Sequence, residues 1–341
     1  MKVCVTGVAG FVGSHLAKKL KSLGYHVVGA DWKRPEPDCI QVEESCDEFM
    51  LEDLRSYAAC VRATRGCRRV YHLAADMGGM GFIQSNHSLC VLNNALIDLH
   101  LIEACRINGV ERVFYSSSAC VYPEHLQMSE SALGLTESDA WPAKPQDAYG
   151  LEKLFAESAY ERYASDFGID VRVARFHNVY GPRGTWRGGR EKAPAAMCRK
   201  VAVAEDGESV EIWGDGKQTR SFVFVDDIVD GIVRLTDSDV STPMNIGTEE
   251  LVSVDELADV VADISGKVLV KRHVPGPEGV RGRNSDNTFM RLKLGWEPPT
   301  KLRDGLERTY VWVSGMVEKS AADIENLRSS VVVRQEMVPL P

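Results

Sequence analysis

The chain has 341 residues, of which 44% are apolar and 26% are charged, and its formal net charge is −9. This composition is typical of a folded globular protein and excludes disordered, collagen-like and coiled-coil chains. At about 150 residues per domain, the length predicts two domains or one α/β unit with an added lobe. The negative charge argues against binding to nucleic acid or to an anionic membrane through overall charge.

Nine cysteines are scattered along the chain without a CxxC pair or a clustered His/Cys spacing. Their odd number and their spacing argue against a disulfide framework and against a structural zinc site, so we expect no metal. No apolar run reaches the roughly 18 residues that span a bilayer. Residues 3–5 already read as a strand, which leaves no room for a signal peptide, and we expect a cytoplasmic protein.

In the first half of the chain, short β-branched runs alternate with amphipathic stretches of helix length, which is typical of βα units on a parallel sheet. The expected strands occupy residues 3–6, 26–31, 69–73, 112–116 and 170–175. The expected helices occupy residues 13–23, 53–63, 94–108 and 148–167. We therefore predict an α/β fold built on a doubly wound parallel sheet.

After residue 175 the sequence becomes rich in Gly, Pro and Arg, first at 180–190 and again at 275–279. Shorter elements lie between these loops, and a helix followed by a loose tail is expected from residue 314. We predict a Rossmann domain at 1–177 and a smaller C-terminal substrate-binding lobe at 178–318. Some segments of this lobe are expected to return to the sheet, and 319–341 is expected to be a tail.

A glycine-rich loop joins the first strand to the first helix. It consists of Gly7, Gly10, Phe11, Val12 and Gly13 in a GxxGxxG pattern. Glycines allow a tight turn and a close approach of the backbone, so that a pyrophosphate can lie on the helix N-terminus, where free N–H groups and the helix dipole favour negative charge. The context of strand, loop and helix predicts a dinucleotide site.

Carboxylates after the next two strands bear on which dinucleotide binds. Asp31 ends the strand at 26–31, where a carboxylate accepts hydrogen bonds from ribose hydroxyls and repels a 2′-phosphate, which favours NAD over NADP. Lys33 and Arg34 follow it, however, and such cations can hold a 2′-phosphate. Asp53 follows a strand-like stretch at 48–51, and it either contacts the adenine or caps a helix.

Tyr149 and Lys153 lie four residues apart, on one face of an expected helix, where an ammonium favours ionisation of the phenol. Ser118 follows a central strand at its carboxyl end, where ligands of such sheets bind. Together these residues resemble the Ser-Tyr-Lys centre of the extended short-chain dehydrogenase/reductase superfamily. The resemblance implies that the tyrosine removes a hydroxyl proton, that the lysine lowers its pKa and holds the ribose, and that the serine bonds the reacting oxygen. Leu73 and Ala74 are added to the expected cofactor contacts.

Cys120 lies two residues beyond this serine. A free cysteine is often just a small core residue, but a thiolate in cationic surroundings can remove a carbon-bound proton that a neighbouring ketone makes acidic. Dehydratases of the superfamily place an acidic pair at this point, whereas this chain has Ala119 and Cys120. The sequence therefore disfavours dehydration.

Six longer segments resemble the GDP-mannose 3,5-epimerase family of plants and algae, and the resemblance runs from residue 2 to about 317. They are residues 74–87, 117–123, 139–142, 188–196, 213–216 and 275–287. The resemblance implies that NAD oxidises carbon 4 of the mannosyl ring, that carbons 3 and 5 epimerise beside the ketone, and that carbon 4 is reduced again. Cys120 and Lys192 would be the acid and base on opposite faces of the ring. The products would be GDP-L-galactose and GDP-L-gulose, precursors for ascorbate and cell walls.

The same resemblance implies a set of substrate contacts. It comprises Gly78, Ser118, Ala119, Cys120, Asn178, Glu191, Lys192, Ala193, Lys200, Gln218, Thr219, Arg220, Arg281, Arg283 and, in the C-terminal segment, Ser330. Superfamily members commonly dimerise through two helices, here those at 94–108 and 148–167, so we expect a homodimer.

Three other functions are weighed against this one. GDP-4-keto-6-deoxymannose epimerase-reductase shares a cysteine near the serine but uses NADPH, which Asp31 disfavours, and has a histidine where this chain has Lys192. A UDP-sugar 4-epimerase would need neither Cys120 nor Lys192. A non-catalytic NAD-binding regulator would not need Tyr149 and Lys153.

Overall fold

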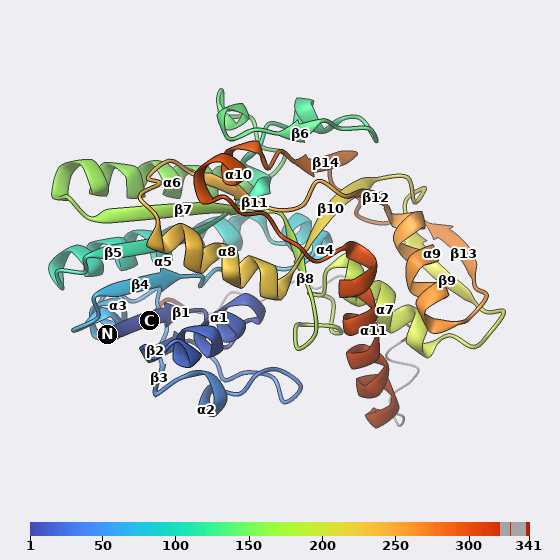
Figure 1. Cartoon of the computed structure of the whole chain (residues 1–341), viewed down its shortest axis with the longest axis horizontal. Helices are drawn as coiled ribbons and strands as arrows, with labels where there is room; N and C mark the ends of the chain where they lie inside the picture. The colour runs from blue at the N-terminus through green and yellow to red at the C-terminus, as the bar shows by residue number, and fades with distance from the viewer. Residues whose placement is uncertain (321–327, 329–338) are drawn as a thin grey trace.

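The computed structural model of the chain describes residues 1–320, 328 and 339–341 (Figure 1). Its centre is a seven-stranded sheet in the order β11-β7-β5-β4-β1-β2-β3, in which every neighbouring pair is parallel. These strands are β1 (Lys2–Thr6), β2 (His26–Asp31), β3 (Glu48–Leu51), β4 (Arg69–His72), β5 (Arg112–Ser118), β7 (Asp170–Phe176) and β11 (Met244–Ile246).

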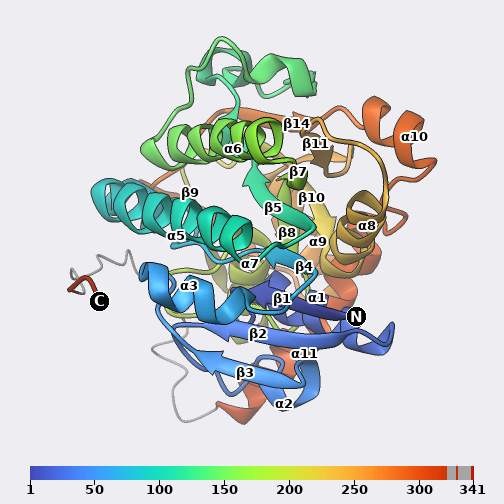
Figure 2. The same cartoon turned by 90° about the vertical axis from the view of Figure 1, so that its left-hand side faces the viewer.

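Helices cover both faces of this sheet, which is why its central strands read as apolar runs. One face carries α3 (Tyr57–Thr64), α5 (His87–Ile107) and α6 (Ala148–Phe167), which share a core with the sheet. The other face carries α1 (Phe11–Ser22) and α8 (Val225–Asp237), and Figure 2 shows the two groups on opposite sides. The short helix α2 (Val42–Ser45) lies beside α1. The predicted doubly wound fold is confirmed.

A smaller lobe follows the sheet. Its strands are β10 (Thr219–Phe224), β12 (Leu251–Ser253), β14 (Gly282–Ser285), β6 (Gly134–Leu135) and β8 (Asn178–Tyr180), with β9 (Ser209–Trp213) and β13 (Val270–Val274) forming a separate pair. Its helices are α7 (Ala193–Val203), α9 (Val254–Ser265), α10 (Thr288–Leu294) and α11 (Leu302–Lys319), and α7, α9 and α11 pack together. Between these elements the chain returns to the main sheet through α8 and β11.

The predicted strands and the helix at 148–167 agree closely with the structure, but other bounds differ. The helix expected at 53–63 begins at Tyr57, and the helix expected at 94–108 begins earlier, at His87. The helix expected from residue 314 begins at Leu302 and ends at Lys319, because Leu302, Leu306 and Val313 form its buried face. The strand β11 was not predicted, since its three residues are too few to show a period.

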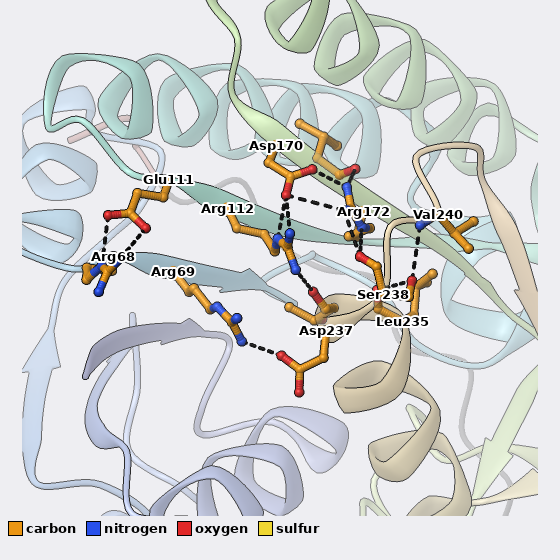
Figure 3. A network of polar contacts seen from close by, with 12 residues as sticks. Arg68, Arg69, Glu111, Arg112, Asp170, Arg172, Leu235, Asp237, Ser238 and Val240 are labelled. Carbon is orange, nitrogen blue, oxygen red and sulfur yellow. Dashed lines mark hydrogen bonds and ion pairs between the residues drawn. The ribbon is translucent and has the colours of Figure 1, made fainter. Parts of the chain in front are cut away.

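Arginines at the amino ends of the strands bind the C-terminus of α8 (Figure 3). Arg69 donates to Asp237 at 2.5 Å, and Arg172 donates to the carbonyl oxygen of Ser238 at 2.7 Å. Arg112 donates both to Asp170 and to the carbonyl oxygen of Thr236. Cations satisfy the last carbonyls of a helix and complement its dipole. These contacts hold the fold together at the end of the sheet away from the strand termini where ligands bind.

Helix α5 is the one helix in the described part of the chain that is long and apolar enough to cross a membrane. Its apolar character has another explanation, because Cys90, Leu101, Ile102 and Cys105 are fully buried. α5 also packs alongside α6 and α3.

Candidate active site

The glycine-rich loop packs so closely against the backbone around it that a side chain would not fit at two of its glycines. Gly7 has a φ of +70°, and a Cβ there would lie 2.8 Å from the backbone nitrogen of Ala74. A Cβ at Gly13 would lie 2.1 Å from the carbonyl oxygen of Gly7. The first N–H groups of α1, from Phe11 to Gly13, have no partner within the helix. This geometry fits a pyrophosphate on the helix N-terminus.

Asp31 ends β2 beside this loop, and its Oδ2 accepts a hydrogen bond from the backbone N–H of Ala9 at 2.9 Å. Burial raises the pKa of Asp31, and the hydrogen bonds from Ala9 and Lys33 oppose that effect. The ammonium of Lys33 pairs with Glu36, and Arg34 pairs with Glu43. The two cations that could have held a 2′-phosphate are therefore engaged elsewhere.

Asp53 does not cap a helix, because the residue before α3 is Ser56. Its carboxylate instead accepts hydrogen bonds from the guanidinium of Arg55, at 3.1 Å from Nε and 2.6 Å from Nη2. The capping interpretation is therefore wrong, and the adenine contact stays a prediction.

Cys120 lies in a short 3-10 turn (Ala119–Val121) directly after β5. Ser118 caps this turn, because its Oγ accepts a hydrogen bond from the backbone N–H of Cys120 at 3.1 Å. Helix α6 passes very close to the turn, since a Cβ at Gly150 would lie 2.1 Å from the carbonyl oxygen of Cys120. Gly150 is thus what lets Tyr149 approach Cys120 and Ser118.

Tyr149 is buried in an apolar cluster with Met77, Phe82 and Cys90. Burial raises the pKa of Tyr149 well above its usual value, Cys120 adds to the rise, and Ser118 opposes it. Lys153, which the superfamily resemblance implies would lower this pKa, is not among its largest contributors. The reason is the direction in which the lysine points.

The ammonium of Lys153 donates a hydrogen bond to the hydroxyl of Tyr115 at 3.0 Å and lies 3.5 Å from Asp98. It lies 6.0 Å from the centre of the Tyr149 ring. Asp98 also binds His72 at 2.7 Å, and His72 in turn contacts Thr6. This buried polar network fixes the position of the Lys153 ammonium against β5 and α5.

Lys192 lies at the N-cap of α7, after the segment rich in glycine and arginine. This segment is held against the loop before α4 (Met80–Ser85), because the N–H of Gly79 donates to the carbonyl oxygen of Arg190 at 3.2 Å. Burial lowers the pKa of the Lys192 ammonium, Cys120 opposes the shift, and Arg283 adds to it. A lowered pKa allows a lysine to act as a base nearer to neutral pH.

One cavity of about 210 Å³ brings Ser118, Cys120 and Lys192 together at the carboxyl ends of the strands. Tyr149 and Lys153 are not among its lining residues. Its polar lining includes Ser118, Cys120, Gln146, Asp147, His177, Asn178, Glu191, Lys192, Lys200, Gln218, Arg220 and Arg283. Gly78, Ala119 and Ala193 line it as well. Most of the predicted substrate contacts thus share one pocket.

Three predicted substrate contacts do not line this cavity. Thr219 alternates with Gln218 and Arg220 along the chain, so its side chain points the other way and donates to the carbonyl oxygen of Glu130. Arg281 is held outside by Asp215 at 2.7 Å, together with Glu130. Ser330 lies outside the described residues.

A family model described as "NAD dependent epimerase/dehydratase family" matches residues 3–247 of the chain. The chain belongs to this family. As an NAD-dependent enzyme, this epimerase has NAD as its cofactor. Its residues fit that group, because the glycine loop leads directly into the N-terminus of α1, which no side chain caps, and the Asp31 carboxylate lies beside the loop.

The relatives of this epimerase include two plant proteins. It is 53% identical over 336 residues to GDP-mannose 3,5-epimerase 1 of Oryza sativa subsp. japonica, with 98% of this chain and 88% of the rice protein covered. The identity and coverage are the same for GDP-mannose 3,5-epimerase of Arabidopsis thaliana.

Solved structures of other epimerases are similar over nearly the whole chain. UDP-glucose 4-epimerase of Thermotoga maritima, solved with UDP-glucose, is 28% identical with a TM-score of 0.81, covering 93% of this chain and 100% of that one. The enzyme of Thermus thermophilus, solved with NAD, is 26% identical with a TM-score of 0.79, covering 92% and 99%. The predicted superfamily is confirmed.

Sequence reasoning missed His177 in this epimerase. It follows β7, is almost fully buried, and neither ring nitrogen has a hydrogen-bond partner among the residues that the structure describes. Burial and the charge of Arg283 lower its pKa to about 3, so the imidazole stays neutral. The signal that could have found it is a polar residue immediately after a buried parallel strand, where ligands bind.

Replacing Asp31 with serine is expected to weaken NAD binding by about tenfold or more, because a hydrogen bond to a charged group contributes about 1.5–3 kcal/mol. Binding of NADP should improve, since the carboxylate that repels a 2′-phosphate is removed. Titration of the cofactor-stripped protein with both dinucleotides measures this. Lys33→Gln is the control and should leave NAD affinity unchanged, because Lys33 pairs with Glu36.

The neutral state of His177 predicts a pH dependence of stability. Below pH 6.5 the unfolded chain binds a proton at this histidine, whereas the folded chain does not until pH falls to about 3. Stability therefore falls with pH by about 1.4 kcal/mol per unit across this window. His177→Gln should remove that part of the slope, measured by urea unfolding at several pH values. Exposed His87→Gln is the control, and an identical slope in both variants would contradict the prediction.

Proposed function

We propose that this epimerase is a GDP-mannose 3,5-epimerase that converts GDP-D-mannose to GDP-L-galactose and to the 5-epimer GDP-L-gulose. The observation that carries the proposal is the presence of Ser118, Cys120 and Lys192 in one cavity, with Tyr149 close to Cys120 and Ser118. A 4-epimerase needs a tyrosine but no further acid–base pair. The 53% identity to the plant enzymes supports the same substrate.

The glycine loop and Asp31 would hold NAD, which would supply reversible hydride transfer at carbon 4 of the mannosyl ring. Tyr149 takes the proton of the carbon-4 hydroxyl, and Ser118, beside it, bonds the same oxygen. Lys153, anchored by Asp98 and Tyr115, holds the nicotinamide ribose. Burial of Tyr149 favours the phenol, so a positive charge next to it is needed at the moment of proton removal.

The ketone at carbon 4 makes the hydrogens on carbons 3 and 5 acidic. Inversion requires that a proton leave one face of the ring and arrive on the other. Cys120 extends from the end of β5, and Lys192 extends from the start of α7. Two acid–base groups from different elements of the fold can flank a ring that lies between them.

The diphosphate needs cations. Arg220 on β10 and Lys200 on α7 both line the cavity. Burial lowers the pKa of Lys200 to about 8.

The test is incubation of the purified protein with GDP-mannose in deuterated water without added cofactor, followed by NMR of the sugar. Deuterium at carbons 3 and 5, together with signals of GDP-galactose, is the expected result. If the substrate reacts only when NADPH and a 4-keto-6-deoxy sugar are supplied, the enzyme is instead a GDP-4-keto-6-deoxymannose epimerase-reductase.

The proposal includes a homodimer in the cytoplasm, serving the supply of ascorbate and cell-wall sugars. The free cysteines support a reducing compartment. Support for the dimer comes from α5 and α6, which lie side by side (Figure 2). Both helices expose large apolar side chains, which are Val91, Leu92, Ile107, Leu151, Phe155 and Phe167.

Replacing Leu151 and Phe155 together with glutamate is expected to yield monomers. These side chains are 55% and 52% exposed on α6, and buried carboxylates without partners oppose association. Sedimentation at micromolar concentration measures the change. Val268→Glu, at an exposed site away from α5 and α6, is the control and should remain a dimer.

A further inference from the structure

We propose that Arg283 is a positioning residue for Cys120, holding its sulfur toward the sugar and pairing with the thiolate that arises when carbon-bound protons move. This inference rests on the proposed function, since it concerns the epimerisation step. It assigns Arg283 a role different from the diphosphate contact that the family resemblance implies.

The contact itself is direct. Nη1 of Arg283 donates to Sγ of Cys120 at 3.3 Å, from β14 across to the turn after β5. An arginine is charged at all relevant pH values, so its hydrogen bond strengthens when the sulfur becomes negative. The guanidinium therefore stabilises the negative sulfur that a proton transfer produces.

The side-chain amide of buried Gln127 fixes the orientation of the Arg283 guanidinium. Nε of Arg283 donates to Oε1 of Gln127, a fully buried residue. The Gln127 amide is itself fixed, because its Nε2 donates to the carbonyl oxygens of Tyr122 at 3.0 Å and of Pro123 at 3.1 Å. Arg283 is thus held by the same loop that continues from Cys120. This keeps Nη1 of Arg283 at a fixed position relative to the Cys120 sulfur.

The other groups around the sulfur come from several elements. Cys120 lies close enough to Lys192, Arg220 and Tyr149 to raise the pKa of each of them. His177 faces Arg283 and stays neutral, so it adds no further positive charge. Of the three cations, Arg283 is the one with a hydrogen bond to the sulfur.

The proton transfers balance with Arg283 protonated throughout. The Cys120 thiolate takes a proton from the ring, so an S–H bond forms, the C–H bond breaks, and the electron pair moves into the enolate of the 4-ketone. Lys192 then gives a proton to the opposite face and becomes a neutral amine. Before the next inversion, Cys120 loses its proton to solvent and Lys192 gains one from solvent. The guanidinium stabilises the sulfur whenever it is negative.

The first test uses the free enzyme and needs no substrate. Arg283→Gln should slow alkylation of Cys120 by iodoacetamide about tenfold, because the thiolate is the nucleophile. Arg283→Lys should restore part of the rate. Arg303→Gln is the matched control, because this arginine pairs with Asp263 on the surface, and it should alkylate at the wild-type rate. Mass spectrometry of the Cys120 peptide measures the rates.

The second test separates positioning from substrate binding. In Arg283→Gln, kcat for deuterium exchange at carbons 3 and 5 should fall about 100-fold, as for loss of one preorganised donor. KM should change less than threefold or so, because the contact acts on the sulfur. Oxidation at carbon 4, followed by nicotinamide absorbance, should continue.

Two results would overturn the inference: unchanged alkylation in Arg283→Gln, or a rise in KM with kcat preserved, which would make Arg283 a diphosphate ligand. Failure of the proposed function looks different, because wild type would then leave GDP-mannose untouched while the alkylation contrast remained. Arg283→Lys keeps the test informative if the glutamine variant does not fold.

Discussion

Cys120→Ala is expected to lower epimerisation at carbons 3 and 5 by about 10³-fold, within the 10²–10⁴ range that a positioned acid–base group contributes. Carbon 4 should still be oxidised, because Ser118, Tyr149 and Lys153 are intact. The cavity keeps its cations but loses the group that moves the proton on one face. NMR in deuterated water measures the exchange, and nicotinamide absorbance measures the hydride step.

Cys39→Ala is the matched control, since Cys39 is the other partly accessible cysteine and lies outside the cavity lining. Burial raises the pKa of Cys39 to about 11, so it is a poor nucleophile. Epimerisation at the wild-type rate in Cys120→Ala would refute the acid–base assignment. Loss of both steps together would indicate a collapsed cavity, which the melting temperature would reveal.

Gly150→Ala is expected to lower stability by about 1–3 kcal/mol, the usual cost of forcing extra atoms into a packed site. A Cβ at this position would lie 2.1 Å from the carbonyl oxygen of Cys120, and backbone has to move to relieve that contact. Because Tyr149 and Cys120 flank the contact, activity should fall about 100-fold, as for a displacement near 1 Å. Thermal unfolding and the exchange assay measure the two effects.

Gly315→Ala is the control for this substitution. Gly315 lies inside α11, and beyond its own stretch of helix no described atom lies within 4 Å of the position that a Cβ would occupy there, so alanine fits freely. Helix propensity then predicts a gain of about 0.5–1 kcal/mol. Equal stability and full activity in Gly150→Ala would show that α6 does not need its close approach to the turn.

Much of the site was predictable because it depends on local sequence. The glycine loop, Asp31 and the Tyr149–Lys153 spacing all lie where a parallel strand ends or a helix turns. Alternation along a strand also explains why Gln218 and Arg220 line the cavity while Thr219 does not. That outcome was available from the sequence, since side chains of a strand alternate in direction.

The tertiary structure decided the partners of charged groups. Lys153 is adjacent to Tyr149 on one helix face, yet its ammonium contacts Asp98 and Tyr115, which come from α5 and β5. Arg281 and Arg283 are two residues apart, yet one is held on the surface by Asp215 and the other contacts Cys120. Sequence spacing carries no information on such contacts.

The sequence by itself determined the parallel sheet, the nucleotide cradle and the residue types of the reacting centre, because periodicity, glycines and strand ends are local features. Only the tertiary structure decided which cation faces the thiol, why Gly150 is required, and that His177 is buried and neutral. Those features depend on the packing of β5, α6, β7 and β14, which are distant in sequence, and on the desolvation that this packing imposes.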